Sequence, residues 1–523
     1  MSETSVTEVY GRGDECYASP QIRIAGGRSP SSSDGRSSDD EYPGNLDGYD
    51  LFQQKAGDFY RGANEILELA GIKSGHMAFS AFLSTYDPEI NPTVTSSIDA
   101  EKERIDSSWI TAARKVHALL SEGGCVQFSV EITDKAAFLP QKYHPVARSH
   151  KIYPVWNTTL RRILKENDIQ QWTSLGCYRV GTSDMAAECP VTVMVTVDPY
   201  AHKDWRGTRD CIVQTLDEIG CSDIVVMIKK DMANPPMVNA FFSNWVIATD
   251  IWRKNGVKPG DQNAMKALNF EQPSVEDMSI ESKRLNDQYQ DIVKSPSFKV
   301  IKEAMKNDEL VFPRDRKIYD LNLQIAGHYE SQLNKLRGMK ANNSHSLGTI
   351  FACSGERVIE STTIKDARKT IIDWSLISVH STRLGNNMSN TYDPLPDFMP
   401  PAMNIVPLAH RRSHEIGESA GLFKVGRGTG YTAGIYNSLR TAYIHTISQG
   451  GKETVDATIE HNILGDFSQE GDSGALIFDR HLEVVGLLFA GHQRTGITYF
   501  THIEDVFHDI KRMTGALDVR IKE

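Results

Sequence analysis

Residues 465–491 read GDFSQEGDSGALIFDRHLEVVGLLFAG and place Ser473 inside a Gly-Asp-Ser-Gly turn. Gly471 and Gly474 let the backbone turn tightly, so the amides of Gly471 and Ser473 can converge on one point. The apolar runs ALIFD and EVVGLLFAG, separated by the polar RHLE, predict a β-hairpin after the turn. Two interpretations fit this stretch alone: a nucleophile turn with an oxyanion hole, anchored by Asp472, or an ordinary tight turn between strands.

Two stretches upstream add context to the serine turn. TIIDWSLISV places Asp373 at the start of an apolar strand, and GLFKVGRGTGYTAGIYN predicts a strand followed by a Gly/Thr-rich hairpin. In this order, the three motifs resemble those of the trypsin-like (chymotrypsin-fold, PA clan) serine peptidases, most of all the large fungal intracellular members with an N-terminal extension. The resemblance covers residues 340–512 well and residues 270–340 loosely.

The resemblance implies a fold and a set of roles. The fold is a trypsin-like antiparallel double β-barrel that ends in a helix at about residues 503–513. Ser473 is the nucleophile, Asp373 orients the catalytic histidine, and the amides of Gly471 and Ser473 form the oxyanion hole. Phe467, six residues before the nucleophile, occupies the floor of the substrate pocket, which implies an apolar or shallow pocket.

The histidine that would act as the catalytic base is not found where the resemblance implies it. A serine hydroxyl is a poor nucleophile at neutral pH unless a neighbouring base takes its proton. The resemblance implies a histidine within about residues 240–270, yet no histidine occurs between His202 and His328. The segment KNGVKPGD resembles the part of the family that follows the catalytic histidine, with Asn255 or Gly256 near the position of the imidazole.

Other histidines are substitutes to be weighed. His345, in the loop NNSHSLG that enters the strand before Asp373, is a weak candidate and the first to check. His328 lies in a helical pattern on a predicted solvated face, and His380 and His492 follow strands at positions more typical of surface residues.

Two functions therefore remain open. The first is a serine endopeptidase that hydrolyses peptide bonds through an acyl-enzyme on Ser473. The second is a catalytically inactive pseudopeptidase that binds peptides or acts as a scaffold. An α/β-hydrolase is excluded by pattern, because its Gly-x-Ser-x-Gly elbow would need glycine where Ala475 stands.

The pattern of the whole chain predicts a multidomain α+β protein. We expect a disordered tail over residues 1–48, a small α/β domain over 50–235, and a linker with a remnant of the first barrel over 236–275. A helical insertion over 276–338 and the trypsin-like barrel domain with its C-terminal helix over 340–523 complete the chain. Within the insertion, the apolar residues at helical spacing are Ile318, Leu321, Ile325, Tyr329, Leu333 and Leu336.

Composition indicates which classes of partner and which cellular location fit this chain. The 523 residues carry a net charge of −11 and no long Lys/Arg cluster, which argues against nucleic acid and anionic membranes as partners. The sequence shows no signal peptide and no membrane-spanning run, and its seven cysteines lack a C-x-x-C pair. We expect an intracellular protein, cytoplasmic or nuclear, with reduced thiols, no metal, no cofactor and a polypeptide substrate or ligand. Its oligomeric state stays open.

Overall fold

The computed structural model of the chain forms two compact units, which are described separately. The first comprises residues 1–237, 358–371 and 408–506, and the second comprises residues 238–357, 372–407 and 507–523. The units cut across the predicted boundary at residue 340. The structure describes residues 8–10, 16–18, 49–82, 93–101, 108–126, 128–134, 139–201, 203–231, 233–234, 252, 255–355, 357–363, 368–384, 409–410, 415–449, 452–492 and 494–521.

A closed antiparallel barrel forms the C-terminal part of the first unit. Its strands follow the order β17-β20-β21-β22-β19-β18, and pairing of β17 with β18 closes the circle. This ring of six strands is one closed antiparallel barrel of the kind that the resemblance implies. The strands are β17 (Gly421–Gly426), β18 (Gly430–Gln449), β19 (Lys452–Leu464), β20 (Leu476–Asp479), β21 (Glu483–His492) and β22 (Thr498–His502), and the two-residue β16 (Ala409–His410) adds to β21.

The C-terminal helix α10 (Ile503–Thr514) directly follows β22, as the sequence predicts. Its four apolar residues on one face are all buried, and its exposed side carries charged groups. The buried residues are Ile503, Val506, Phe507 and Ile510. Spacing of three and four residues therefore located this helix correctly.

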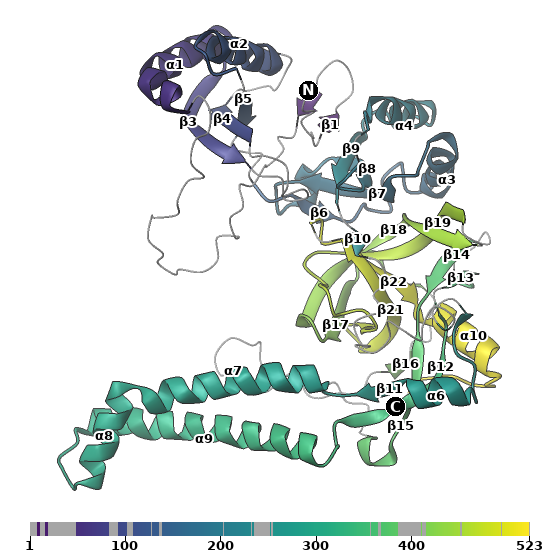
Figure 1. The fold of residues 1–523 in the computed structure, drawn as a ribbon. Helices are drawn as coiled ribbons and strands as arrows, with labels where there is room; N and C mark the ends of the chain where they lie inside the picture. Colours follow the sequence, from purple (N-terminus) through teal and green to yellow (C-terminus); the bar gives the residue numbers. More distant parts are fainter. Residues whose placement is uncertain are drawn as a thin grey trace. The chain divides into compact units, whose positions relative to one another are not determined.

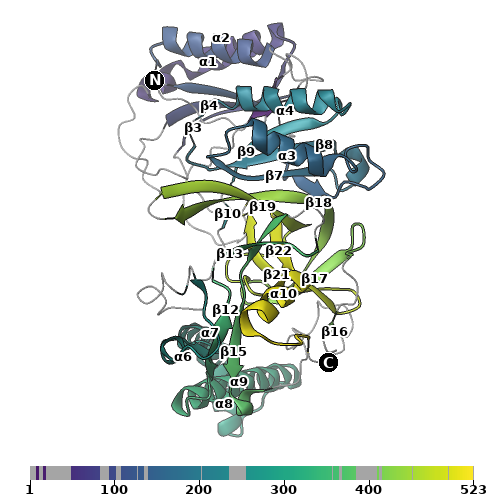
Figure 2. The same ribbon diagram turned by 90° about the vertical axis from the view of Figure 1, so that its right-hand side faces the viewer.

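The barrel sheet continues without interruption into an α/β module. Strand β18 pairs with β7 (Trp172–Gly181), next to β8 (Val191–Val197) and β9 (Val225–Lys230). β8 and β9 are parallel and joined by α4 (Arg206–Glu218), so the predicted strand-helix-strand unit is confirmed. In Figure 2, α4 and α3 (Trp156–Glu166) cover the same face of this sheet. The short strands β6 (Lys142–His144) and β10 (Ala233–Asn234) pair with β7 and β21.

A second α/β module precedes this one, so residues 50–235 contain two sheets rather than one small domain. It consists of α1 (Tyr49–Leu69), β3 (Lys73–Phe82), β4 (Thr93–Glu101), α2 (Ser108–Glu122) and β5 (Ser129–Asp134). β3 and β4 are antiparallel and β4 and β5 are parallel, which is the arrangement of β7, β8 and β9. Both modules therefore have the order helix-strand-strand-helix-strand.

Matching residues show that the two modules repeat one another in detail. In each module the second helix, α2 or α4, is followed by a glycine with positive φ, 98° at Gly124 and 74° at Gly220. The next amide bonds back to the helix in both: Cys125 N to Leu120 O at 2.9 Å and Cys221 N to Leu216 O at 2.8 Å. The same separation along the chain relates Trp109 to Trp205, Val116 to Ile212, Leu120 to Leu216, Cys125 to Cys221 and Phe128 to Ile224, all buried.

Two short strands correct the expectation that residues 1–48 lack structure. β1 (Glu8–Tyr10) and β2 (Cys16–Ala18) pair with each other, and β1 adds to the edge of β9. Both are short Tyr-containing segments on either side of Gly-Arg-Gly-Asp, a sequence suited to a turn between strands. Residues 19–48, which hold the Ser-rich segment of the predicted tail, lie outside the described residues.

The second unit contains, in its described residues, a three-stranded antiparallel sheet of order β11-β12-β15 rather than the closed second barrel that the resemblance implies. Its strands are β11 (Asn269–Glu271), β12 (Ser346–Cys353) and β15 (Ser375–Val379), and α6 (Gln262–Ala267) precedes β11. Most of the predicted linker before residue 252 lies outside the described residues. Strands β13 (Arg357–Glu360) and β14 (Lys369–Ile372) form a separate pair.

The predicted helical insertion of the second unit consists of α7 (Val275–Lys294), α8 (Pro296–Lys306) and α9 (Pro313–Ala341), with α7 and α9 side by side (Figure 1). Ser274 and Ser295 cap α7 and α8. The predicted apolar face of α9 is only partly correct. The buried residues are Tyr319, Ala326 and Leu333, at seven-residue spacing, whereas Ile318 and Leu321 are 47% and 56% exposed.

No helix in the described part of the chain is both long enough and apolar enough to cross a membrane.

Candidate functional site

The Ser473 turn is held tightly to the barrel. Gly471 and Gly474 on either side of the Asp-Ser pair have φ angles of 92° and 85°, which L side chains rarely adopt. The turn is then tied to β21, because Gly474 N donates to Leu488 O at 2.8 Å and Leu488 N donates to Ala475 O at 3.1 Å. The two glycines allow the reversal that the sequence predicts.

Asp472 anchors this turn from inside the barrel. Its side chain is fully buried and its Oδ1 accepts the backbone amides of Gly428 (2.7 Å) and Thr429 (3.1 Å). Its Oδ2 accepts the Thr429 hydroxyl (2.7 Å) and the Gln469 amide (3.1 Å). Four donors therefore surround the carboxylate, which supports the anchoring role expected for Asp472.

A buried lysine neutralises Asp472. Lys424 Nζ lies 3.0 Å from Asp472 Oδ2, and neither side chain has any exposed area. The same ammonium donates to Thr429 Oγ1 (2.6 Å) and to Gly430 O (3.2 Å). Burial lowers the pKa of Lys424, while burial alone would raise that of Asp472. The bonds from Gln469, Thr429 and Lys424 outweigh burial, so the pKa of Asp472 is lowered and the pair is ionic.

The glycines of the KVGRGTG hairpin, residues 424–430, make room for this pair. A Cβ on Gly426 would lie 2.3 Å from Asp472 Oδ1, and a Cβ on Gly428 would lie 2.5 Å from Glu470 O. Any side chain at these positions would displace the carboxylate or the neighbouring backbone. The Gly-rich motif therefore forms the wall of the Asp472 pocket.

The hydroxyl of Ser473 has a hydrogen-bond acceptor, whereas two backbone amides of the turn have none in the described residues. The Ser473 hydroxyl donates to Phe489 O at 3.2 Å, a backbone acceptor on β21. Within the described residues, neither Gly471 N nor Ser473 N donates a hydrogen bond. Two free amides beside a serine hydroxyl are the donor set of an oxyanion hole.

Phe467, the predicted floor of the substrate pocket, is a core residue. Its side chain has no exposed area and packs with Leu422, Tyr436 and Ile463 inside the barrel. The Thr432 hydroxyl donates to Phe467 O at 2.6 Å, which fixes the backbone as well. The ring stabilises the barrel and offers no surface to a ligand in this structure.

Asp373 lies in the second unit, in a turn that precedes β15. Its neighbour Trp374 exchanges bonds with Ser354, through Ser354 N to Trp374 O and Trp374 N to Ser354 Oγ, both at 2.9 Å. The Trp374 indole donates to Asp509 of α10 at 2.9 Å, and Arg357 pairs with the same carboxylate at 2.6 Å. These contacts fix the turn. Ser473 belongs to the first unit, so a meeting of Asp373 and Ser473 stays a prediction.

The segment that resembles the surroundings of the catalytic histidine lies close to this turn. Val257 forms an antiparallel bridge with Cys353, whose thiol is close enough to Asp373 for that carboxylate to raise its pKa further after burial. Gly256 has a φ of 71°, and a Cβ there would lie 2.4 Å from Cys353 O. Gly256 therefore cannot be replaced by a side chain without moving the backbone. Asn255 is exposed.

His345, the weak candidate for the base, lies at the other end of β12 from Asp373. It directly precedes the strand, where its Nδ1 lies 3.3 Å from Met339 O and its Nε2 lies 3.8 Å from Glu271. The Asp373 turn flanks Cys353, which ends the strand. Eight strand residues span roughly 26 Å, so the structure does not bring His345 and Asp373 together.

His328 and His380, which share the second unit with Asp373, lie on other parts of it, and His492 belongs to the first unit. His380 lies near the start of β12, where its backbone amide donates to Leu347 O at 2.9 Å, and His328 is exposed on α9. His492 corrects the expectation of a surface residue, because only 4% of it is exposed. It lies 3.7 Å from Asp231, but burial outweighs that carboxylate and lowers the pKa of the imidazole.

Comparison with known proteins supports the motif assignment. The model of peptidase family S64, a trypsin-like serine peptidase family of the PA clan, matches residues 270–518. Slightly less than half of the chain is therefore similar to this family. No curated protein matches the chain. The Rv3671c protease from M. tuberculosis, in its active form, is 19% identical to the part it covers, with a TM-score of 0.17. The match covers 33% of this chain and 76% of that protease.

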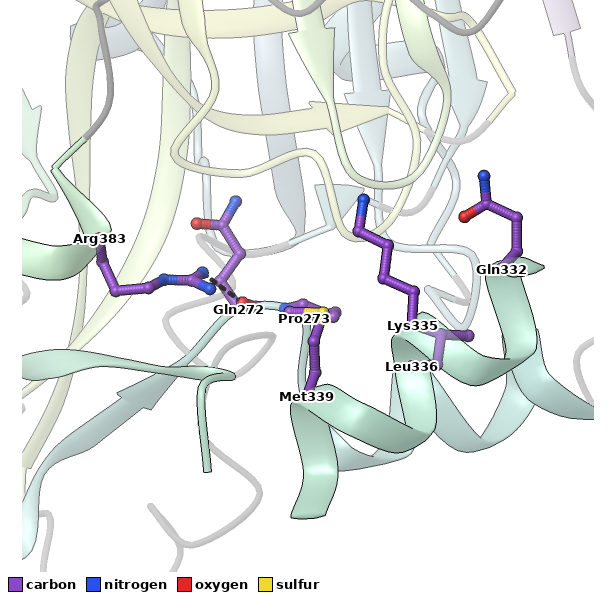
Figure 3. A pocket seen from close by; sticks show the side chains of 7 residues that line it. All are labelled: Gln272, Pro273, Gln332, Lys335, Leu336, Met339 and Arg383. Carbon is purple, nitrogen blue, oxygen red and sulfur yellow. Dashed lines mark hydrogen bonds between the residues drawn. The ribbon is translucent and has the colours of Figure 1, made fainter. Parts of the chain in front are cut away.

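A groove of about 550 Å³ lies in the second unit, at the base of the helical insertion. Figure 3 shows it between the last turns of α9 and the segment that leads into α7, with Arg383 bonded to Gln272 O at 2.6 Å. It contains neither Asp373 nor any residue of the Ser473 turn. Its lining residues are Gln272, Pro273, Gln332, Lys335, Leu336, Met339 and Arg383. Among the residues described, no three potential metal ligands cluster.

Proposed function

We propose that this chain is a relative of trypsin-like serine peptidases that binds polypeptide segments without cleaving them. The observation that carries the proposal is the backbone beside the Asp373 turn. There the resemblance puts Asn255 or Gly256 near the position of the catalytic imidazole, and Gly256 leaves no room for a side chain. The chain supplies no other histidine between His202 and His328.

The environment of Ser473 supports the same conclusion. A serine acts as a nucleophile when a base accepts its proton, and here the hydroxyl donates to the Phe489 carbonyl, which cannot act as that base. Removal of a triad member leaves only about 10³–10⁴-fold acceleration over water from binding and the oxyanion hole. That acceleration is far too small for a working peptidase, whereas binding does not require the base.

The alternative is a serine endopeptidase that works through an acyl-enzyme on Ser473. The observation in its favour is the retained machinery of the turn: Gly471 and Ser473 amides without acceptors, and a buried carboxylate behind them. This alternative needs a base from a part of the chain other than residues 203–327.

We also propose an intracellular location, in the cytoplasm or the nucleus. The free cysteines support it, because reduced thiols are typical of these compartments. Those in the described residues are Cys125, Cys177, Cys189, Cys211, Cys221 and Cys353.

Labelling with a fluorophosphonate probe separates the two functions. The full chain and Ser473→Ala should label at the same slow rate, because the hydroxyl has no base. Neither should release fluorescence from a quenched peptide library, while both should retain peptides from a non-cleavable library in a pull-down. Ser473-dependent labelling together with hydrolysis would establish the endopeptidase instead, and retention of no peptide would refute the binding function.

A further inference from the structure

The buried Lys424–Asp472 pair lies directly behind two unused backbone donors. We propose that Lys424 is the positioning residue of an anion site, formed by the amides of Gly471 and Ser473, that holds the C-terminal carboxylate of a bound peptide. This inference rests on the proposed binding function and names the chemical group that is bound. It assigns a role to a lysine that has no place in a catalytic triad.

The donors are suited to a carboxylate. Gly471 N and Ser473 N are two residues apart in a turn with positive φ at Gly471, and in the described residues neither has an acceptor. Successive amides of this kind form concave sites for anions, and terminal carboxylates are a recurrent ligand of them. An uncharged carbonyl would accept the same bonds more weakly, because hydrogen bonds to an ionised group are roughly twice as strong.

The charge behind the turn decides whether an anion is tolerated. Asp472 is the residue between the two donors, and an uncompensated carboxylate there would repel a bound anion. Lys424 Nζ, at 3.0 Å, neutralises that carboxylate, and four further donors fix its position: the amides of Gly428, Thr429 and Gln469 and the Thr429 hydroxyl. Both groups are buried, so solvent screens neither of them.

Lys424 also sets the shape of the site. Through Thr429 and Gly430 it holds the 424–430 hairpin against Asp472, and Asp472 in turn fixes the backbone on which both amides lie. Lys424 is the cation that pairs with Asp472, and its charge contributes to the lowered pKa of that carboxyl. Loss of the ammonium should therefore remove both the neutral background and the orientation of the donors.

Two versions of one library test the ligand class. A degenerate hexapeptide library with free C-termini and the same library with C-terminal amides are passed over the immobilised full chain, and enriched peptides are measured by fluorescence anisotropy. We expect the free acid to bind at least about tenfold more tightly than its amide, as for a charged hydrogen-bonded group. Equal affinity of acid and amide refutes the anion site but leaves peptide binding intact. Binding of neither form refutes the binding function as well.

Variants then test Lys424. Lys424→Met should abolish the preference for the acid, whereas Lys165→Met, an exposed lysine of α3 in the same unit, should keep it. Because Lys424→Met leaves a buried charge and can fail to fold, Lys424→Met/Asp472→Asn is made in parallel. With both charges absent it should fold but still lack the acid preference, because no ammonium holds the 424–430 hairpin in place. A preference retained in folded Lys424→Met, or recovered in the folded double variant, refutes the role of Lys424 as the positioning residue.

Discussion

Glu460 makes the stability of the first unit depend on pH in an unusual direction. Its side chain, on β19, has no exposed area, and it accepts bonds from Thr370 Oγ1 at 2.7 Å and Ile371 N at 2.8 Å. Burial raises its pKa from 4.5 to about 7, more than these bonds and that of Thr458 lower it. The native state therefore holds a proton on Glu460 that the unfolded chain releases above pH 4.5.

The magnitude follows from the two pKa values. Below pH 4.5 the group is protonated in both states and its stabilising effect is complete. As the pH rises from 4.5 to 7, the unfolded chain releases this proton and the native state keeps it. The free energy of unfolding therefore falls by about 3 kcal/mol, because each pKa unit corresponds to about 1.4 kcal/mol. This contribution falls with increasing pH, opposite to that of carboxylates whose native pKa is lowered.

Glu460→Gln removes this contribution, because the amide is neutral at every pH. The difference in unfolding free energy between wild-type and variant should fall by about 3 kcal/mol from pH 4.5 to 7.5, measured by urea titration at four pH values. Contributions of all other groups cancel in that difference. Glu65→Gln, at an exposed residue on α1, serves as the matched control for the replacement of a glutamate by glutamine at the surface of the same unit. A pH-independent difference for Glu460→Gln would show that the carboxyl is not held protonated.

Three further substitutions test other contacts, each by thermal or urea unfolding. Gly256→Ala should destabilise the second unit by at least about 1 kcal/mol, because its Cβ would meet Cys353 O at 2.4 Å; wild-type stability would contradict the close approach. Asp509→Ala should cost about 2–4 kcal/mol, since it leaves the Trp374 indole without its acceptor, and a loss below 1 kcal/mol would contradict this anchor. Phe467→Ala should cost about 3–5 kcal/mol as a core deletion, whereas a gain in peptide affinity without loss of stability would restore its predicted role in a pocket.

The barrel could be predicted because its signals are local. The KVGRGTG hairpin, the Ser473 turn and the apolar runs of β20 and β21 are each short, and their order along the chain carried the family resemblance that implied a barrel. The α10 helix was equally local, with its buried face spaced at three and four residues. Patterns of this length depend on backbone preference and burial alone.

The repeated α/β modules were missed although the sequence contains a signal for them. Buried positions of α2 and β5 recur in α4 and β9 at constant separation, including Trp109 with Trp205 and Cys125 with Cys221. The other residues of the modules have diverged, so only comparison of the chain with itself would detect the repeat. The apolar face of α9 was misplaced for a different reason. The buried residues of α9 recur every seven positions, whereas the apolar residues of its sequence recur at intervals of three and four. The second pattern therefore includes side chains that the structure leaves exposed.

The site depends on contacts that no single segment encodes. The sequence suggested that Asp472 anchors its loop, but its partner Lys424 is apparent only when β17 and β20 pair and close the barrel. Gly256 is the reverse case: the resemblance puts Asn255 or Gly256 near the position of the histidine, and only the structure shows that the backbone at Gly256 leaves no room for a side chain. A His introduced at Gly256 should therefore fail to supply the missing base.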